Sequence, residues 1–273
     1  MNKLPCLALL LSSVFAVNAD PVATAEVKVE PVVEPVETAV VAAIVAEKAV
    51  LDTDTLVNEI DQYRGLADGG FSFDITNISY KKGRDPRTNT LSVDVQDDKS
   101  LVKFNSPARQ RGRVLLKQEN DMWLYIPGTR KVIRISPAQR LLGETSNGDV
   151  AGTNFASDYN AEITTTEEDT KNGHIQLTLN AKTRKISYTK VTFWLTDDAT
   201  HQPVRSEYYA RSGKLLKTAH YREFKDYNGE QKIHKMLLVD PVMEGNYTWM
   251  KFDNYRASEL PPAIFSKEAI VNL

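Results

Sequence analysis

The stretch that decides the fold reads SPARQRGRVLL over residues 106–116 and DMWLYIPGTRKVIRI over residues 121–135. Successive side chains of a β-strand point to opposite faces, so Trp123 and Tyr125 share one face of the first extended run. Pro127 and the glycine after it end that run, and a second run of alternating apolar and basic residues follows. The stretch therefore predicts a β-hairpin within an antiparallel sheet.

The same period-two alternation recurs on both sides of this hairpin. Phe71, Phe73 and Ile75 alternate with polar residues, and residues 82–86 supply the glycine and proline of a turn. The expected strands cover residues 71–75, 91–95, 101–104, 113–118, 122–126, 131–135, 174–179, 187–195, 204–210, 214–224, 233–239 and 247–252. So many strands with short turns indicate a mainly β fold, whose antiparallel sheet curls or closes to protect its edges.

Two segments depart from the strand pattern. One amphipathic helix is expected at the start of the domain, with Asp54 as its cap and Gly65 at its end. Its apolar face carries Leu56, Val57, Ile60 and Tyr63. Residues 136–158 are rich in Gly, Asn and Ser, and we expect a loop and a short helix there.

The first fifty residues have a different composition. Residues 1–19 combine a short apolar run with a small-residue cleavage pattern, which predicts a cleaved signal peptide and export. Cys6, the one cysteine of the chain, would leave with it, so disulfides and thiolate metal sites are excluded from the mature protein. Residues 20–50 are nearly all Val, Ala, Glu and Pro and predict a linker or tether. Residues 51–273 then form one large β domain.

Charge is distributed unevenly along the domain. Ten basic residues stand against two acidic ones over residues 99–140, whereas residues 141–170 hold seven acidic residues and no basic one. A basic half beside an acidic half gives the surface a dipole, which suits docking to an anionic membrane or a charged partner. The alternative is that these charges lie on strand faces exposed to solvent. Nucleic acid is not an expected partner, because export removes the chain from it and no Lys/Arg-Gly-Phe stacking motif is present.

The sequence offers little catalytic chemistry. Its four histidines are His174, His201, His220 and His234, and no two have the i, i+4 spacing of a helical metal site. There is neither a G-x-S-x-G elbow nor a glycine-rich phosphate loop. We therefore expect no enzyme, no cofactor and no metal site.

The opening stretch resembles the outer-membrane lipoprotein-sorting family, the LolA-like proteins. The likeness is to the branch in which a W-x-Y-x-P strand precedes a basic hairpin, and here those letters are Trp123, Tyr125 and Pro127. It covers roughly residues 52–273 and is strongest over residues 104–159. It implies a LolA/LolB-like fold, in which helices close a half-open antiparallel barrel around an apolar cavity for acyl chains.

That branch usually carries a Ser/Gly-Ser-Asp-Phe-like segment after the hairpin. This chain has Asn154 in place of the acid, so the role of that loop stays open.

Several strands are apolar on both faces, as Met122 and Leu124 lie beside Trp123 and Tyr125. Such a sheet needs covering on both faces, and we expect helices on one side and a ligand or partner on the other. The alternative is that each of these side chains belongs to an ordinary hydrophobic core and contacts no ligand. The expected lipid-cavity residues are Leu91, Val93, Phe104, Trp123, Tyr125, Ile133, Ile135, Phe193, Leu237 and Phe252. The expected rim and partner contacts are Arg109, Arg111, Arg113, Arg130 and Arg134, which suit phosphate head groups or acids of a transporter.

Three functional hypotheses follow. The leading one is a monomeric periplasmic carrier that moves a lipid or lipoprotein from an inner-membrane exporter, of the RND/MMPL or ABC type, to the outer membrane. Peripheral contact with a membrane is compatible with it. The second is a regulator of similar fold that senses envelope stress. The third is an enzyme acting on envelope lipid or glycan, which would need an acid, base or nucleophile that the sequence does not display.

Overall fold

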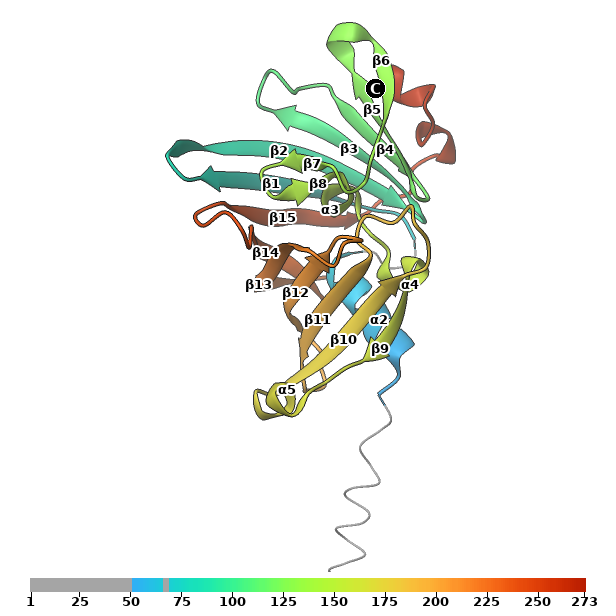
Figure 1. Ribbon diagram of the computed structural model, residues 1–273. Coiled ribbons are helices and arrows are strands. Elements are labelled where there is room, and N and C mark those ends of the chain that lie inside the picture. Colours follow the sequence, from blue (N-terminus) through green and yellow to red (C-terminus); the bar gives the residue numbers. More distant parts are fainter. Residues whose placement is uncertain (1–50, 66–68) are drawn as a thin grey trace, which may run out of the picture. The chain divides into compact units, whose positions relative to one another are not determined.

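The computed structural model describes residues 51–65 and 69–273 (Figure 1). The predicted signal peptide, residues 1–19, and the predicted linker or tether, residues 20–50, lie outside the described residues. Within the described part of the chain, no helix is long and apolar enough to cross a membrane.

One antiparallel sheet of 13 strands dominates the domain. In chain order its strands are β1 (Phe71–Lys81), β2 (Arg84–Gln96), β3 (Lys99–Ser106), β4 (Val114–Gln118), β5 (Asp121–Ile126), β6 (Lys131–Ile135), β9 (Tyr159–Ile163), β10 (His174–Ala181), β11 (Lys190–Thr196), β12 (Pro203–Tyr209), β13 (Leu215–Tyr227), β14 (Glu230–Val239) and β15 (Tyr247–Ala257). The sheet is strongly curved but does not close into a barrel (Figure 1). The predicted mainly β class with a half-open, curved antiparallel sheet is confirmed.

The order of the strands explains the path of the chain. It is β6-β5-β4-β3-β2-β1-β15-β14-β13-β12-β11-β10-β9, so the first and last strands pair at the centre and two meanders extend outward. Strands β6 and β9 are consecutive strands of this sheet in the chain, yet they form its opposite edges. The connection between them, residues 136–158, must therefore cross the sheet, and we call it the crossing segment.

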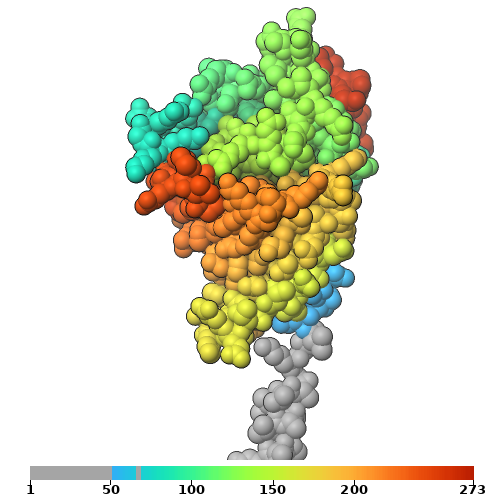
Figure 2. All heavy atoms as spheres, viewed as in Figure 1, coloured from blue at the N-terminus to red at the C-terminus, as the bar shows by residue number. Residues whose placement is uncertain are grey.

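The crossing segment has more structure than the expected loop and short helix. It contains a two-stranded hairpin, β7 (Arg140–Leu142) and β8 (Thr145–Ser146), followed by α3 (Asn147–Ala151) and α4 (Phe155–Asp158). Figure 2 shows its yellow-green atoms between the teal β1–β2 hairpin and the orange strands. A capping box starts α3, in which Ser146 Oγ accepts from the Asp149 amide and the Asp149 carboxylate accepts from the Ser146 amide.

Helix α2 (Thr53–Tyr63) forms where the sequence predicts it, but its cap is Asp52 and not Asp54. The Asp52 carboxylate accepts from the Thr55 amide at 3.0 Å and from Thr55 Oγ1 at 2.7 Å. Both acids are capping types, and Asp52 takes the role because its backbone is extended while Asp54 already lies in the first turn. Gly65 follows the helix with a φ of 80°, a conformation that glycine adopts without strain.

Two other predictions need correction at the strand level. Strand β9 was not predicted, because its sequence YNAEI shows no clear alternation of apolar and polar residues. The turn expected over residues 82–86 is shorter, since β2 begins at Arg84. Short helix α5 (Glu167–Lys171) precedes β10.

The sheet has a distinct apolar cluster on each face. The inner face, which α2 and the crossing segment cover, holds the larger cluster and includes Leu56, Leu142 and Phe155. The outer face of β3–β5 packs against the chain's own C-terminal residues, where η2 (Pro262–Ile264) and η3 (Ala269–Val271) flank Phe265. The ligand or partner expected on this second face is therefore replaced by the C-terminal segment, residues 260–273, which comes back along the outer face after β15.

Candidate functional site

The inner face of the sheet is lined by apolar side chains from both meanders. On β1 the inward residues are Phe73 and Ile75, and directly opposite Ile75 on β2 lies Leu91. Directly opposite residues share a face, so the pairing continues the apolar surface across neighbouring strands. The rest of β2 and the other strands add Val93, Val95, Val102, Phe104, Leu115, Met122, Leu177, Leu179, Phe193, Leu195, Met236, Leu238, Met250 and Phe252.

Helix α2 covers part of this surface and anchors the end of the crossing segment. Leu56 and Ile60 are at most 1% exposed. The Asp61 carboxylate accepts from the backbone amides of Phe155 at 3.1 Å and Ala156 at 2.9 Å, which joins α2 to the start of α4. Burial of Asp61 raises the pKa of its carboxyl to about 6. The two hydrogen bonds lower the pKa and so offset part of this shift.

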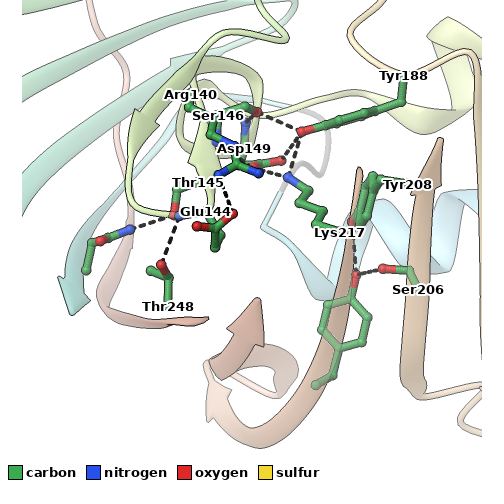
Figure 3. A network of polar contacts seen from close by, with 12 residues as sticks. Arg140, Glu144, Thr145, Ser146, Asp149, Tyr188, Ser206, Tyr208, Lys217 and Thr248 are labelled. Atoms are coloured by element: carbon green, nitrogen blue, oxygen red, sulfur yellow. Dashed lines mark hydrogen bonds and ion pairs between the residues drawn. The ribbon is translucent and has the colours of Figure 1, made fainter. Parts of the chain in front are cut away.

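Polar groups attach the rest of the crossing segment to the inner face (Figure 3). Asn77 on β1 donates to Thr145 Oγ1 at 2.7 Å. Thr248 on β15 accepts from the Glu144 amide at 3.0 Å. Thr145 and Thr248 are both fully buried, so these bonds lie away from bulk water.

The centre of the network is a buried ion pair between Lys217 on β13 and Asp149 on α3 (Figure 3). Lys217 Nζ also donates to the Tyr188 hydroxyl at 2.6 Å, and that hydroxyl lies 2.8 Å from Ser146 Oγ. Burial lowers the pKa of Lys217 and the Asp149 carboxylate acts against that shift. Nearby, Tyr208 and Ser206 bring their hydroxyl groups to Tyr221, so that the polar groups satisfy one another.

The β7–β8 hairpin approaches the sheet very closely. A Cβ at Gly143 would lie 2.4 Å from Thr248 Oγ1 and 2.5 Å from Ser79 Cβ, and the φ of Gly143 is 61°. Only glycine meets both constraints. Next to it, Arg140 forms ion pairs with Glu144 at 2.8 Å and with Asp240 at 3.1 Å.

Two cavities open at opposite ends of β1. The basic cavity has a volume of about 270 Å³ and adjoins Ser79 and Lys81, at the end of the strand. The aromatic cavity has a volume of about 230 Å³ and is lined by Phe71, Tyr227 and Tyr255. Phe71 and Tyr255 also pack against the inner cluster, so the apolar surface reaches solvent here.

The structure divides the ten expected cavity residues between the two faces. Seven belong to the inner face: Leu91, Val93, Phe104, Ile133, Ile135, Phe193 and Phe252. Ile133 is placed there because it lies opposite Leu124, which packs on the inner cluster, and its side chain is 41% exposed. The other three, Trp123, Tyr125 and Leu237, lie on the outer face. The ten residues therefore do not line one cavity, because neighbouring residues of β5 are apolar on both faces.

The expected rim residues are likewise not a single group. Arg109 lines the basic cavity, while Arg111 donates to the Asn105 carbonyl at 3.1 Å within the β3–β4 connection. Arg113 immediately precedes β4. On the β5–β6 hairpin, Arg130 occupies the turn and Arg134 pairs with Asp121 on the outer face.

Sequence reasoning missed Lys217, Asp149 and Tyr188. One signal was available, because Lys217 has the same parity on its strand as Ala219 and Tyr221, which are buried on the inner face. Within the described ranges, no group of three or more His, Asp or Glu side chains is arranged to hold a metal ion.

Comparison with known proteins agrees with this architecture. A family model described as an uncharacterized protein matches residues 96–272. No curated protein matches the sequence. A LolA superfamily protein from Nitrosomonas europaea has a TM-score of 0.72 and 25% identity, over 80% of this chain and 99% of its own.

Two further solved structures share the fold. An outer membrane lipoprotein-sorting protein domain from Vibrio parahaemolyticus has a TM-score of 0.67 and 22% identity, over 80% of this chain and 98% of its own. A DUF1329 family protein from Desulfovibrio piger has a TM-score of 0.66 and 21% identity, over 80% and 97%. With its curved open sheet, inner helix and crossing segment, the chain belongs to the LolA-like family.

Proposed function

We propose that the protein is a carrier of the bacterial envelope that binds acyl chains of a lipid or lipoprotein on the inner face of its sheet. The observation that supports this proposal is that the crossing segment, which covers the inner face, makes both apolar and polar contacts with it. The crossing segment buries Leu142 and Phe155 in the apolar cluster, yet hydrogen bonds and an ion pair attach it to the strands. When such a cover moves, its polar groups can bind water, whereas the apolar surface beneath needs a new apolar partner.

Leu141 and Leu142 are the side chains that an acyl chain would replace. Both leucines line the basic cavity; Leu142 belongs to the inner cluster and Leu141 packs against it. The two leucines therefore separate the basic cavity from the inner cluster. Full burial of two leucines would contribute at most about 6 kcal/mol, and Leu141 is only partly buried, whereas an acyl chain recovers about 0.8 kcal/mol for each buried CH₂. At most about eight methylenes would therefore offset the displaced leucines, and a longer chain would favour the open form.

The proposal extends to location and partners. We infer that cleavage after Ala19 releases the chain into the periplasm and that residues 20–50 act as a tether. An inner-membrane exporter of the RND/MMPL or ABC type would load the carrier, and the outer membrane would receive the cargo. The carrier would act as a monomer and without catalysis.

Binding of a fluorescent fatty acid tests the proposal, with Ile133→Glu as the variant. Ile133 is exposed on the inner face, so a charge there should weaken binding about tenfold or more without unfolding the domain. Val271→Glu is the matched control, because Val271 is 38% exposed and lies on the C-terminal segment. Equal binding by Ile133→Glu and the wild type, or no saturable binding by the wild type, would count against the carrier.

A further inference from the structure

The basic cavity combines a charged rim with a neutral floor. It lies at the ends of β1 and β2, beside the β3–β4 connection and the β7–β8 hairpin. Its charged lining residues are Lys81, Arg84, Asp85, Arg87, Arg109 and Arg140.

Positive charge is in excess in this cavity. Arg140 is neutralised by Glu144 and Asp240. Among the described residues, no carboxylate forms an ion pair with Arg84, Arg87 or Arg109, and Asp85 is the acid of the lining. Three guanidinium groups, two from the start of β2 and one from the β3–β4 connection, thus line a space large enough for a phosphate ester, and their planar forks suit its oxygens.

The floor supplies neutral hydrogen-bond donors. Asn89 is 5% exposed and Ser79 is 6% exposed, and both line the cavity. Ser79 Oγ donates only to the Arg87 carbonyl, at a long 3.4 Å. The side-chain amide of Asn89 forms no hydrogen bond with any described residue, and it is not among the buried polar atoms that are cut off from solvent, so it can donate to a ligand in the cavity. An anion at this point would accept from the Asn89 amide while the arginines surround it.

The polarity of the inner face changes in order along β1 and β2. Ser79 lies opposite Arg87, Asn77 opposite Asn89, and Ile75 opposite Leu91. The surface thus passes from basic through amide to apolar within four residues of one strand. A ligand that follows this gradient carries its negative charge at one end and hydrocarbon at the other.

We infer that the basic cavity binds a phosphate group, and that this group is the head group of the lipid cargo. The assignment of the phosphate to a lipid rests on the proposed function, whereas the phosphate site itself does not. Arg84, Arg87 and Arg109 bind the phosphate oxygens, and Asn89 donates to it from the floor. The acyl chains extend from there toward Ile75 and Leu91 once the β7–β8 hairpin has moved.

Isothermal titration calorimetry with three probes tests this inference: inorganic phosphate, glycerol 3-phosphate and dihexanoyl phosphatidylglycerol. The variant is Arg84→Gln/Arg87→Gln/Arg109→Gln, whose three side chains are exposed, so the fold should persist. The control Lys171→Gln/Arg211→Gln/Lys214→Gln removes the same charge from exposed sites elsewhere. We expect all probes to bind the wild type, binding to weaken about tenfold or more in the variant, and the control to stay within about twofold.

A second variant tests the floor. Asn89→Asp keeps the shape of the side chain and places a negative charge beside the phosphate, so it should abolish binding of inorganic phosphate at neutral pH. Thermal unfolding of each variant checks that the fold is retained, and the triple arginine variant decides the question if Asn89→Asp does not fold.

The outcomes separate the possible ligands. Tighter binding of dihexanoyl phosphatidylglycerol than of inorganic phosphate, lost in the triple variant, supports the head-group site. Equal binding of inorganic phosphate by the triple variant and the wild type overturns the inference. Phosphate binding that depends on the arginines, without tighter binding of the lipid, overturns the lipid source and leaves free phosphate as the ligand. If the wild type fails to bind a fatty acid but retains this phosphate binding, the carrier function fails and the phosphate site stands.

Discussion

Lys217 places an ammonium group inside the protein, where Asp149 is the carboxylate that pairs with it. The side chains of Lys217 and Asp149 are 4% and 8% exposed. A buried ion pair adds little compared with apolar packing, but removal of one partner leaves the other charge buried and costs about 3–5 kcal/mol. The pair therefore holds α3 against β13 in one arrangement.

We predict that Lys217→Met lowers the free energy of unfolding by about 3–5 kcal/mol, because the Asp149 carboxylate stays buried without its cation. Adding Asp149→Asn should restore much of the loss. Urea unfolding of both single variants and the double variant measures the coupling. Lys214→Met on the exposed turn before β13 is the control and should change stability by less than about 0.5 kcal/mol. A loss in Lys217→Met as small as in the control would show that the ion pair does not hold the crossing segment.

Asp61 makes the stability of the domain depend on pH. Burial raises the pKa of its carboxyl to about 6, above the unfolded value of 3.8. The folded form therefore retains a proton that the unfolded form releases, and this contribution is fully present below pH 3.8 and lost as pH rises through about 6.

The free energy of unfolding of the wild type should consequently fall between pH 4 and pH 7, by about 1.4 kcal/mol for each unit of the Asp61 shift. Asp61→Asn should reduce this slope, since an amide does not titrate. The variant should also be less stable at every pH, because one amide oxygen cannot serve both the Phe155 and the Ala156 amides as the carboxylate does. Denaturant unfolding at several pH values measures both effects, and parallel curves for the two proteins would refute the role of Asp61.

The C-terminal segment covers the outer face of β3–β5. Phe265 is 2% exposed and packs in the cluster that includes Leu101 and Leu116, and its carbonyl accepts from Gln118 Nε2 at 2.6 Å. We predict that Phe265→Ala lowers stability by about 3–5 kcal/mol through the cavity it leaves. Fatty-acid binding to the remaining folded protein should be unchanged, because this cluster is on the opposite face from the proposed site.

Val271→Ala is the control for that prediction, since Val271 is 38% exposed. Its stability should differ from the wild type by less than about 0.5 kcal/mol. Loss of fatty-acid binding in Phe265→Ala at full stability would move the binding surface to the outer face.

The strands were predictable because alternation is a local property. Phe71, Phe73 and Ile75 identify β1, and Leu91, Val93 and Val95 identify the part of β2 that pairs with it. The helix was predictable from its apolar face, although two acids two residues apart left the capping residue ambiguous.

The face of β5 was not predictable, because its sequence is apolar at successive positions. Met122 and Leu124 pack on the inner cluster while Trp123 and Tyr125 pack on the outer one, and no polar residue marks the difference. The crossing segment depends on which strands form the edges, which is a property of the whole sheet. Lys217 would be assigned to solvent on composition alone, since lysine is rarely buried without a partner.

The fold leaves the inner apolar face of the sheet to be covered by short separate elements. The first and last strands of the sheet, β1 and β15, pair at its centre, and the chain must cross the inner face to connect the two edges. The cover is thus a consequence of topology, and hydrogen bonds and an ion pair attach it to the strands. The proposed function requires the inner face to be the surface that receives acyl chains.

Photo-crosslinking with a fatty acid that carries a diazirine near its methyl end tests this claim most directly. After irradiation and proteolysis, mass spectrometry identifies the labelled peptides. We expect adducts on inward residues of β1, β2 and β15, such as Phe73, Val93 and Phe252, and competition by an unlabelled fatty acid. Adducts confined to the outer face around Trp123 and Tyr125, or labelling that an unlabelled fatty acid does not reduce, would contradict it.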